Sequence, residues 1–245
     1  MKRVSFIVSF FFLSSVLWAT TWFPAEHTCP VCKKKSTYQD IGSYGTYIYN
    51  WPSKYQYIFW PLTDFPSVYS CPGCHFSVYM WDFDSIPAEK TDTLKSYLSN
   101  IKMEKKYKDY LDIPMTIRLE IAEGVYRILG RDTEFWCKFY RVMGYHYEAE
   151  DQAERARSSR LKAIGLVHQM FSDTLYKGQE KELMLIAAAM HYYTGQKDST
   201  LLYLDKANLL TYSNSEMQEQ NVKGLDDYLS GLIEQYKAFI KEEEE

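Results

Sequence analysis

Two Cys-Pro-x-Cys motifs constrain this chain more than any other feature. They are Cys29-Pro-Val-Cys32 and Cys71-Pro-Gly-Cys74, each with proline directly after its first cysteine. Proline fixes φ at that position and stiffens the turn. Two such turns brought together offer four thiolates to one tetrahedral ion, and four-sulfur ligation selects zinc or iron. The sequence therefore predicts one structural zinc ion held by Cys29, Cys32, Cys71 and Cys74, with no coordination position left for a substrate.

The first residues are typical of an export signal. Lys2 and Arg3 precede the uncharged, mostly apolar run from Val4 to Trp18, and Ala19 offers a small residue for cleavage. This run is short for a membrane span and suits the apolar region of a signal peptide. We expect a signal peptide over residues 1–19 and a protein of the periplasm or cell envelope. An uncleaved anchor is the alternative, and only then would the chain contact a membrane.

Export leaves the chemistry of the cysteines open. In an oxidising compartment, paired cysteines usually form disulfides, either structural or redox-active. Cys71 and Cys74 with His75 also match the Cys-x-x-Cys-His attachment sequence of c-type haem, although that interpretation gives Cys29 and Cys32 no role. The odd cysteine, Cys137, lies in an aromatic helical segment and is expected to be a buried, inert thiol.

Residues 20–90 have the composition of a small β-rich, zinc-ribbon-like module. Every proline except Pro114 lies here, and the stretch 44–60 is dense in tyrosine and tryptophan. Short strands are expected at Tyr47–Tyr49, Tyr55–Trp60 and Ser77–Trp81. The aromatic stretch serves either as the core of a thin module or as a binding surface for glycan or protein.

Residues 91–245 show helical spacing instead. A polar helix is expected from Thr93 to Tyr110, a second helix with Pro114 in its first turn and Gly130 at its end, and a final helix carrying Leu225 to Phe239. Within residues 181–210, Ala188, Gly195 and Ala207 follow tetratricopeptide-like spacing, with Asp198 as a helix cap and Thr200 where that motif has alanine. The predicted fold class is α+β, mostly α, with an antiparallel tetratricopeptide-like array; a plain irregular bundle is the alternative.

The four cysteines and their neighbours resemble the bacterial domain-of-unknown-function 2225 family. The resemblance lies in His27-Thr-Cys29-Pro-Val-Cys32, in Tyr69-Ser-Cys71-Pro-Gly-Cys74-His75-Phe76, and in the helical half that follows. It implies metal binding by the four cysteines and a tetratricopeptide-like region, and it implies no activity. The family usually has glycine after each cysteine pair, where this chain has Lys33 and His75.

Other site signatures are missing from the sequence. It contains no phosphate-binding glycine loop and no common hydrolase or metalloprotease motif. The formal net charge of −4 provides no global positive field for nucleic acid. We therefore expect a non-enzymatic zinc-binding adaptor that binds a protein partner through its helical array. A redox protein, either c-type haem or thiol–disulfide, is the alternative.

Overall fold

The computed structural model describes residues 21–43, 55 and 61–243. The predicted signal over residues 1–19, the strand at Tyr47–Tyr49, and all but Tyr55 of the strand at Tyr55–Trp60 lie outside the described residues. Most of the aromatic stretch 44–60 does so as well. Tyr55 itself is described, lies in a turn and is buried.

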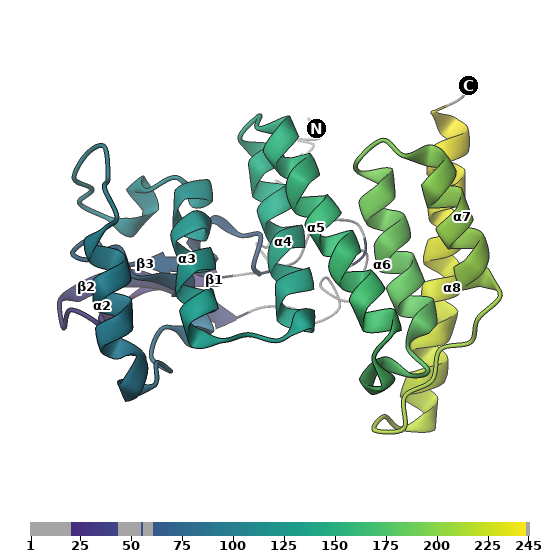
Figure 1. Ribbon diagram of the computed structural model, residues 1–245, viewed down its shortest axis with the longest axis horizontal. Coiled ribbons are helices and arrows are strands. Elements are labelled where there is room, and N and C mark those ends of the chain that lie inside the picture. Colours follow the sequence, from purple (N-terminus) through teal and green to yellow (C-terminus); the bar gives the residue numbers. More distant parts are fainter. Residues whose placement is uncertain (1–20, 44–54, 56–60, 244–245) are drawn as a thin grey trace, which may run out of the picture.

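Two antiparallel hairpins form the β part of the described chain (Figure 1). β1 (Thr21–Thr28) pairs with β2 (Lys35–Ser43), and β3 (Val68–Ser70) pairs with β4 (Ser77–Tyr79). The predicted strand Ser77–Trp81 is thus confirmed over its first part, and residues Met80–Asp82 turn into a 3-10 helix. The β1–β2 hairpin was not predicted, because its residues are mostly polar. Pro24 is tolerated within β1 because a strand of a two-stranded sheet has one free edge.

The first helix is much shorter than the sequence predicted. α2 (Thr91–Ser99) ends at Asn100 instead of continuing to Tyr110. Its anchors, Leu94 and Leu98, are buried. Beyond Asn100, a continued helix would place Lys102 beside Lys105 and Lys106, at separations of three and four residues where like charges repel. The apolar stripe also stops at this point, so nothing offsets that repulsion.

The next helix is built as the sequence indicates, except at its start. α3 (Met115–Leu129) places Ile121 and Val125 in the core and ends at Gly130, whose φ is 76°. A positive φ costs glycine little, so the predicted C-terminal stop is confirmed. Pro114 was predicted to lie in the first turn of this helix, and that prediction is wrong. It has an extended ψ of 140° and is the capping residue before the helix.

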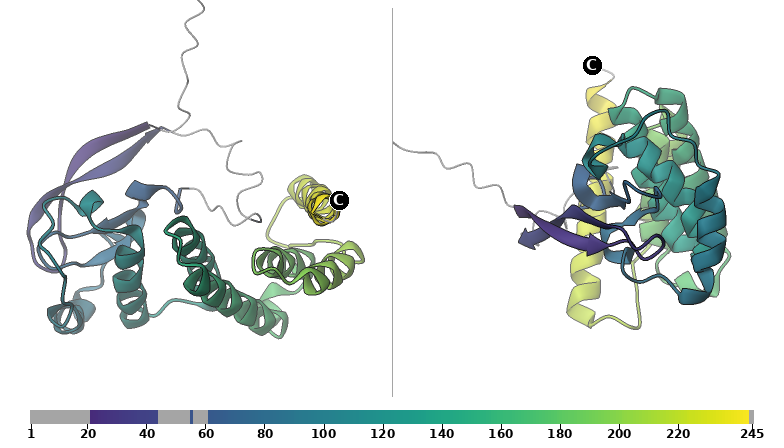
Figure 2. Two further views of the ribbon diagram at one scale, coloured as in Figure 1. Left: turned by 90° about the horizontal axis from the view of Figure 1, so that it is seen from above. Right: turned by 90° about the vertical axis from the view of Figure 1, so that its left-hand side faces the viewer.

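The remaining helices stand side by side in chain order. They are α4 (Thr133–Ala149), α5 (Ala153–Phe171), α6 (Glu180–Tyr192), α7 (Lys197–Asn208) and α8 (Glu219–Glu242). Figure 1 shows α4 to α7 running alternately up and down, and Figure 2 shows from above that the helices follow an arc. Short turns join α4 to α5 and α6 to α7, so each of these pairs is an antiparallel hairpin.

The turn between α6 and α7 confirms one prediction and corrects another. Gly195 has a φ of 73° and lies in this turn, as expected. Asp198 is not the cap, because Gln196 occupies that position and Asp198 falls within the first helical turn. Thr200 is fully buried, and its hydroxyl donates to the carbonyl of Gln196 at 3.0 Å. That hydrogen bond satisfies the polar atom at a position where alanine would suit the packing.

One contiguous cluster of buried residues extends from Cys29 to Ile240. The described chain is mostly helical with two small antiparallel sheets, as the coarse fold prediction stated. Arg118 links α3 to the segment that leads into β3. It is fully buried and donates to the carbonyls of Phe65 and Val68, and also to that of Ile113. Within residues 21–43, 55 and 61–243, no helix has the length and apolarity needed to cross a bilayer.

Candidate metal centre

Each cysteine motif forms the loop of one of the two hairpins. Cys29 to Cys32 joins β1 to β2, and Cys71 to Cys74 joins β3 to β4. The two loops make the same pair of backbone hydrogen bonds. In the first loop, the amide of Lys33 donates to Cys29 O, and the amide of Cys29 donates to Lys34 O; His75, Cys71 and Phe76 repeat this pattern in the second. The local sequence thus builds two copies of one turn.

The residue after each cysteine pair has a left-handed backbone. The φ angle is 64° at Lys33 and 62° at His75. For any residue other than glycine this conformation costs about 1–2 kcal/mol. The turn geometry therefore gives a physical reason for glycine at these two positions, and this chain retains the turn without it.

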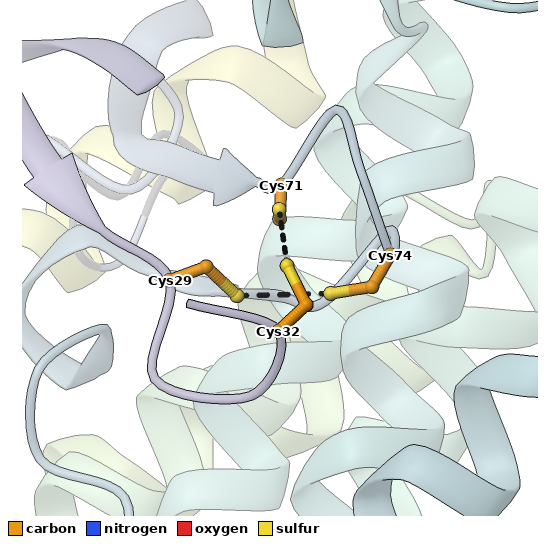
Figure 3. Close-up of side chains that lie close together, drawn as sticks. All are labelled: Cys29, Cys32, Cys71 and Cys74. Atoms are coloured by element: carbon orange, nitrogen blue, oxygen red, sulfur yellow. Dashed lines mark hydrogen bonds between the residues drawn. The ribbon is translucent and has the colours of Figure 1, made fainter. Parts of the chain in front are cut away.

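The two loops bring the four predicted cysteines together (Figure 3). Their Sγ atoms all lie within 4.8 Å of one another. The Cys29–Cys74 separation is 3.6 Å and the Cys32–Cys71 separation is 3.5 Å. A tetrahedral zinc site with Zn–S bonds of about 2.3 Å has S–S edges of about 3.8 Å. These separations match such a site, and they are far longer than the disulfide bond of about 2.05 Å. The group could hold a metal ion.

The electrostatics of the cluster also suit a cation. Hydrogen bonds from the thiols of Cys29 and Cys74 lower the pKa of Cys71. The pKa of Cys29 is raised mainly by its hydrogen bond with Cys71, and the pKa of Cys74 mainly by its hydrogen bond with Cys29. Backbone amides of both loops stabilise the thiolates, and the Gly73 amide lies 3.4 Å from the Cys71 sulfur. A bound dication would replace the shared protons and offset half of the negative charge of the four thiolates.

A layer of packed aromatic rings lies next to the cysteine cluster. Cys29 and Cys71 are fully buried, Cys74 is partly buried, and Cys32 faces solvent. Tyr38 packs on Tyr69 with ring centroids 4.5 Å apart, and both rings contact Phe83. Burial, followed by the charges of the four cysteines, raises the pKa of Tyr38, which keeps this ring neutral beside the sulfurs.

Two contributors to the site were missed by the sequence analysis. A Cβ on Gly73 would lie 2.8 Å from Cδ of Lys34 and within 3.7 Å of two sulfurs, so this glycine lets the Lys34 stem cross the loop. His27 bridges Asp40, at 2.9 Å, and Asp84, at 3.3 Å, beside the aromatic layer. The glycine could have been noted from its place inside the motif. The partners of His27 are distant in sequence and carry no such signal.

Cys137 lies on α4, outside the cluster. It is buried, and its sulfur is 3.8 Å from the carbonyl of Ala163. This placement agrees with the inert thiol expected from the sequence. All five cysteines fall within the described residues, and none of them forms a disulfide in this structure.

Comparison of the chain with protein families, with curated proteins and with solved structures finds no significant match. The resemblance to the domain-of-unknown-function 2225 family rests on the cysteine motifs and stays a hypothesis.

Proposed function

We propose that this chain is an exported, non-enzymatic zinc protein that acts as a protein-binding adaptor. Residues 20–90 form a zinc-ribbon-like module held together by one zinc ion. The helices that follow form a tetratricopeptide-like array that binds the partner. The observation that carries the proposal is the convergence of Cys29, Cys32, Cys71 and Cys74 from two hairpin loops. Four thiolates around one ion leave no open coordination position, which is typical of structural rather than catalytic zinc.

The partner surface is proposed on the side of the array that carries a cavity between its helices. This cavity measures about 590 Å³ and its lining includes residues of α4, α5, α6 and α8, while α7 contributes none of the described lining residues. Tyr55 reaches the same place: its hydroxyl donates to Glu182 at 2.7 Å, and Tyr236 donates to its carbonyl. Tyrosine, methionine and leucine side chains line the cavity together with Glu134, Arg141 and Glu182, which suits a partner segment that carries both an apolar side chain and polar groups.

The redox alternative uses the same cysteines differently. Covalent haem would bond Cys71 and Cys74 and leave Cys29 and Cys32, whose sulfurs lie 3.5 to 3.6 Å from theirs, without a function. Disulfide exchange would instead use the two sulfur pairs that lie close together between the loops, Cys29 with Cys74 and Cys32 with Cys71. Purification of the full chain from cells that export it separates the three possibilities. Zinc bound without a Soret band supports the proposal, whereas a covalent haem spectrum or two intact disulfides would refute it.

The adaptor role is tested by site-specific photo-crosslinking in the same cells. A benzoylphenylalanine is placed at Leu225, which lines the cavity, or at Leu202, an exposed residue of α7 that does not. We expect a discrete crosslinked species from Leu225 that is lost with Tyr228→Ala, a neighbouring lining residue, and no such species from Leu202. Equal crosslinking from both positions, or none from Leu225, would remove the support for a specific partner surface.

A further inference from the structure

The fold brings two lysine runs together beside the metal centre. Lys33 to Lys35 follows the first cysteine pair, and Lys102, Lys105, Lys106 and Lys108 lie in the segment after α2. Lys34, Lys105 and Lys106 line one cavity of about 620 Å³, together with Gly73 and His75 of the second cysteine loop. A neighbouring cavity of about 460 Å³ shares Gly73 and His75 and adds Lys95. Two segments far apart in the sequence thus bring positive charge to one cavity of a protein whose net charge is −4, while Lys95 beside the neighbouring cavity pairs with Asp92.

Lys34, Lys105 and Lys106 are the lysines of this group that are available for a ligand. Lys35 pairs with Glu26, and the Lys33 ammonium donates to the carbonyl of Pro30. By contrast, Lys34 and Lys106 make no ion pair with any described residue, and Lys105 lies 5.2 Å from the ring centre of Tyr107. Glu104 is the one acidic side chain among the described residues that line this cavity. Positive charge here therefore exceeds its local compensation.

One residue that lines both cavities has a polar atom without a partner. Nδ1 of His75 is buried and forms no hydrogen bond within the described part of the chain. Buried polar atoms are normally satisfied, so this residue is unusual among those around the site. The cavity volume lies in the range of about 300–1,000 Å³ that accommodates small organic ligands. The space therefore suits a molecule larger than a simple inorganic ion.

From this geometry we propose that the lysine-lined cavity binds a phosphate-type oxyanion carried by a larger molecule. Ammonium groups of Lys34, Lys105 and Lys106 supply charge-assisted hydrogen bonds to its oxygens. Two sources share this chemistry: a free phosphoester, and the headgroup of an anionic lipid. The nearby zinc centre would carry a charge of about −2 with four thiolates. The competing role of the lysines is therefore to balance that charge, and the test must separate the two.

The test titrates the zinc-loaded full chain with inorganic phosphate and follows the amide resonances of Gly73 and His75. The site variant is Lys105→Gln/Lys106→Gln, which leaves both cysteine loops unaltered. The matched control is Lys177→Gln/Lys223→Gln, which removes two exposed lysines from the helical part. Zinc content is measured for every sample. A parallel arm measures binding to phosphatidylcholine vesicles with and without equimolar phosphatidylglycerol.

We expect the site variant to weaken phosphate binding about tenfold or more, and the control to bind as the parent does. Binding only to phosphatidylglycerol vesicles, lost in the site variant alone, supports the same site with lipid as the source. Equal loss in both variants, or no binding of either probe by the parent chain, overturns the proposal. A site variant that loses zinc but binds phosphate normally also overturns it, because the lysines then serve the metal centre.

Discussion

Replacement of Cys71 by serine should release the β1–β2 hairpin while the helices stay folded. Cys71 is fully buried and sits among the other three sulfurs, so its loss leaves three ligands. Structural zinc sites contribute about 10–16 kcal/mol of apparent binding energy. Shared equally among four thiolates, that is about 2.5–4 kcal/mol for each ligand.

Apart from the metal centre, the β1–β2 hairpin is held mainly by Tyr38 in the aromatic layer and by the contact of His27 with Asp84. No residue of β1 is buried, and Tyr38 is the one buried residue of β2. A two-stranded hairpin on its own is marginally stable in water. A deficit of about 2.5–4 kcal/mol should therefore appear first as local opening of residues 21–43. α4 to α8 lie outside this region and keep their own packing.

Hydrogen exchange measures this opening directly. In Cys71→Ser, the amides of residues 21–43 should exchange on the order of a hundredfold faster, with zinc bound more weakly and α4 and α5 unaltered. Cys137→Ser is the matched control, because Cys137 is also buried but lies outside the cluster. It should keep zinc and leave residues 21–43 protected. The reasoning fails if Cys71→Ser leaves this hairpin as protected as the parent does.

Three further predictions concern single side chains. Lys33→Gly should be more stable than Lys33→Ala by about 1–2 kcal/mol in urea unfolding, because glycine relieves the positive φ of 64° at this position; equal stability would mean that the left-handed backbone is not strained. Burial lowers the pKa of His146 to about 4 from an ordinary value of 6.5, so the unfolded chain takes up the proton first as pH falls. Stability should then drop by about 2 kcal/mol between pH 7 and pH 5, and His146→Gln should remove this part of the pH dependence; an unaltered pH profile would contradict the assignment. Tyr55→Phe should cost about 1–3 kcal/mol by removing the donor to buried Glu182, and the loss should shrink in a Glu182→Ala background. Additive effects of these two substitutions would show that the pair does not interact.

The cysteine cluster could be predicted because its information is local. A proline after the first cysteine sets each turn, and two turns of one kind imply one shared site. The surrounding hairpin could not be predicted from the same sequence, because β1 and β2 expose most of their side chains and so lack an alternating apolar pattern. In this region the turn positions the strands, and strand propensity contributes little.

Helix ends show the same contrast between local and distant causes. Gly130 and Gly195 were predicted as turn residues because their positive φ is a local requirement that glycine meets. The predicted end of α2 was wrong, because the prediction extended an apolar stripe into a lysine-rich segment. Part of that segment lines a cavity together with the second cysteine loop. The two lysine runs lie far apart in the sequence, so their meeting could only be found in the fold.

The measurement that tests the account most directly is X-ray absorption at the zinc edge of the purified full chain. We predict one zinc per chain with four sulfur neighbours at about 2.3 Å and no oxygen or nitrogen in the shell. A mixed shell, or a chain without zinc whose cysteines are bridged, would contradict the claim that Cys29, Cys32, Cys71 and Cys74 hold one ion.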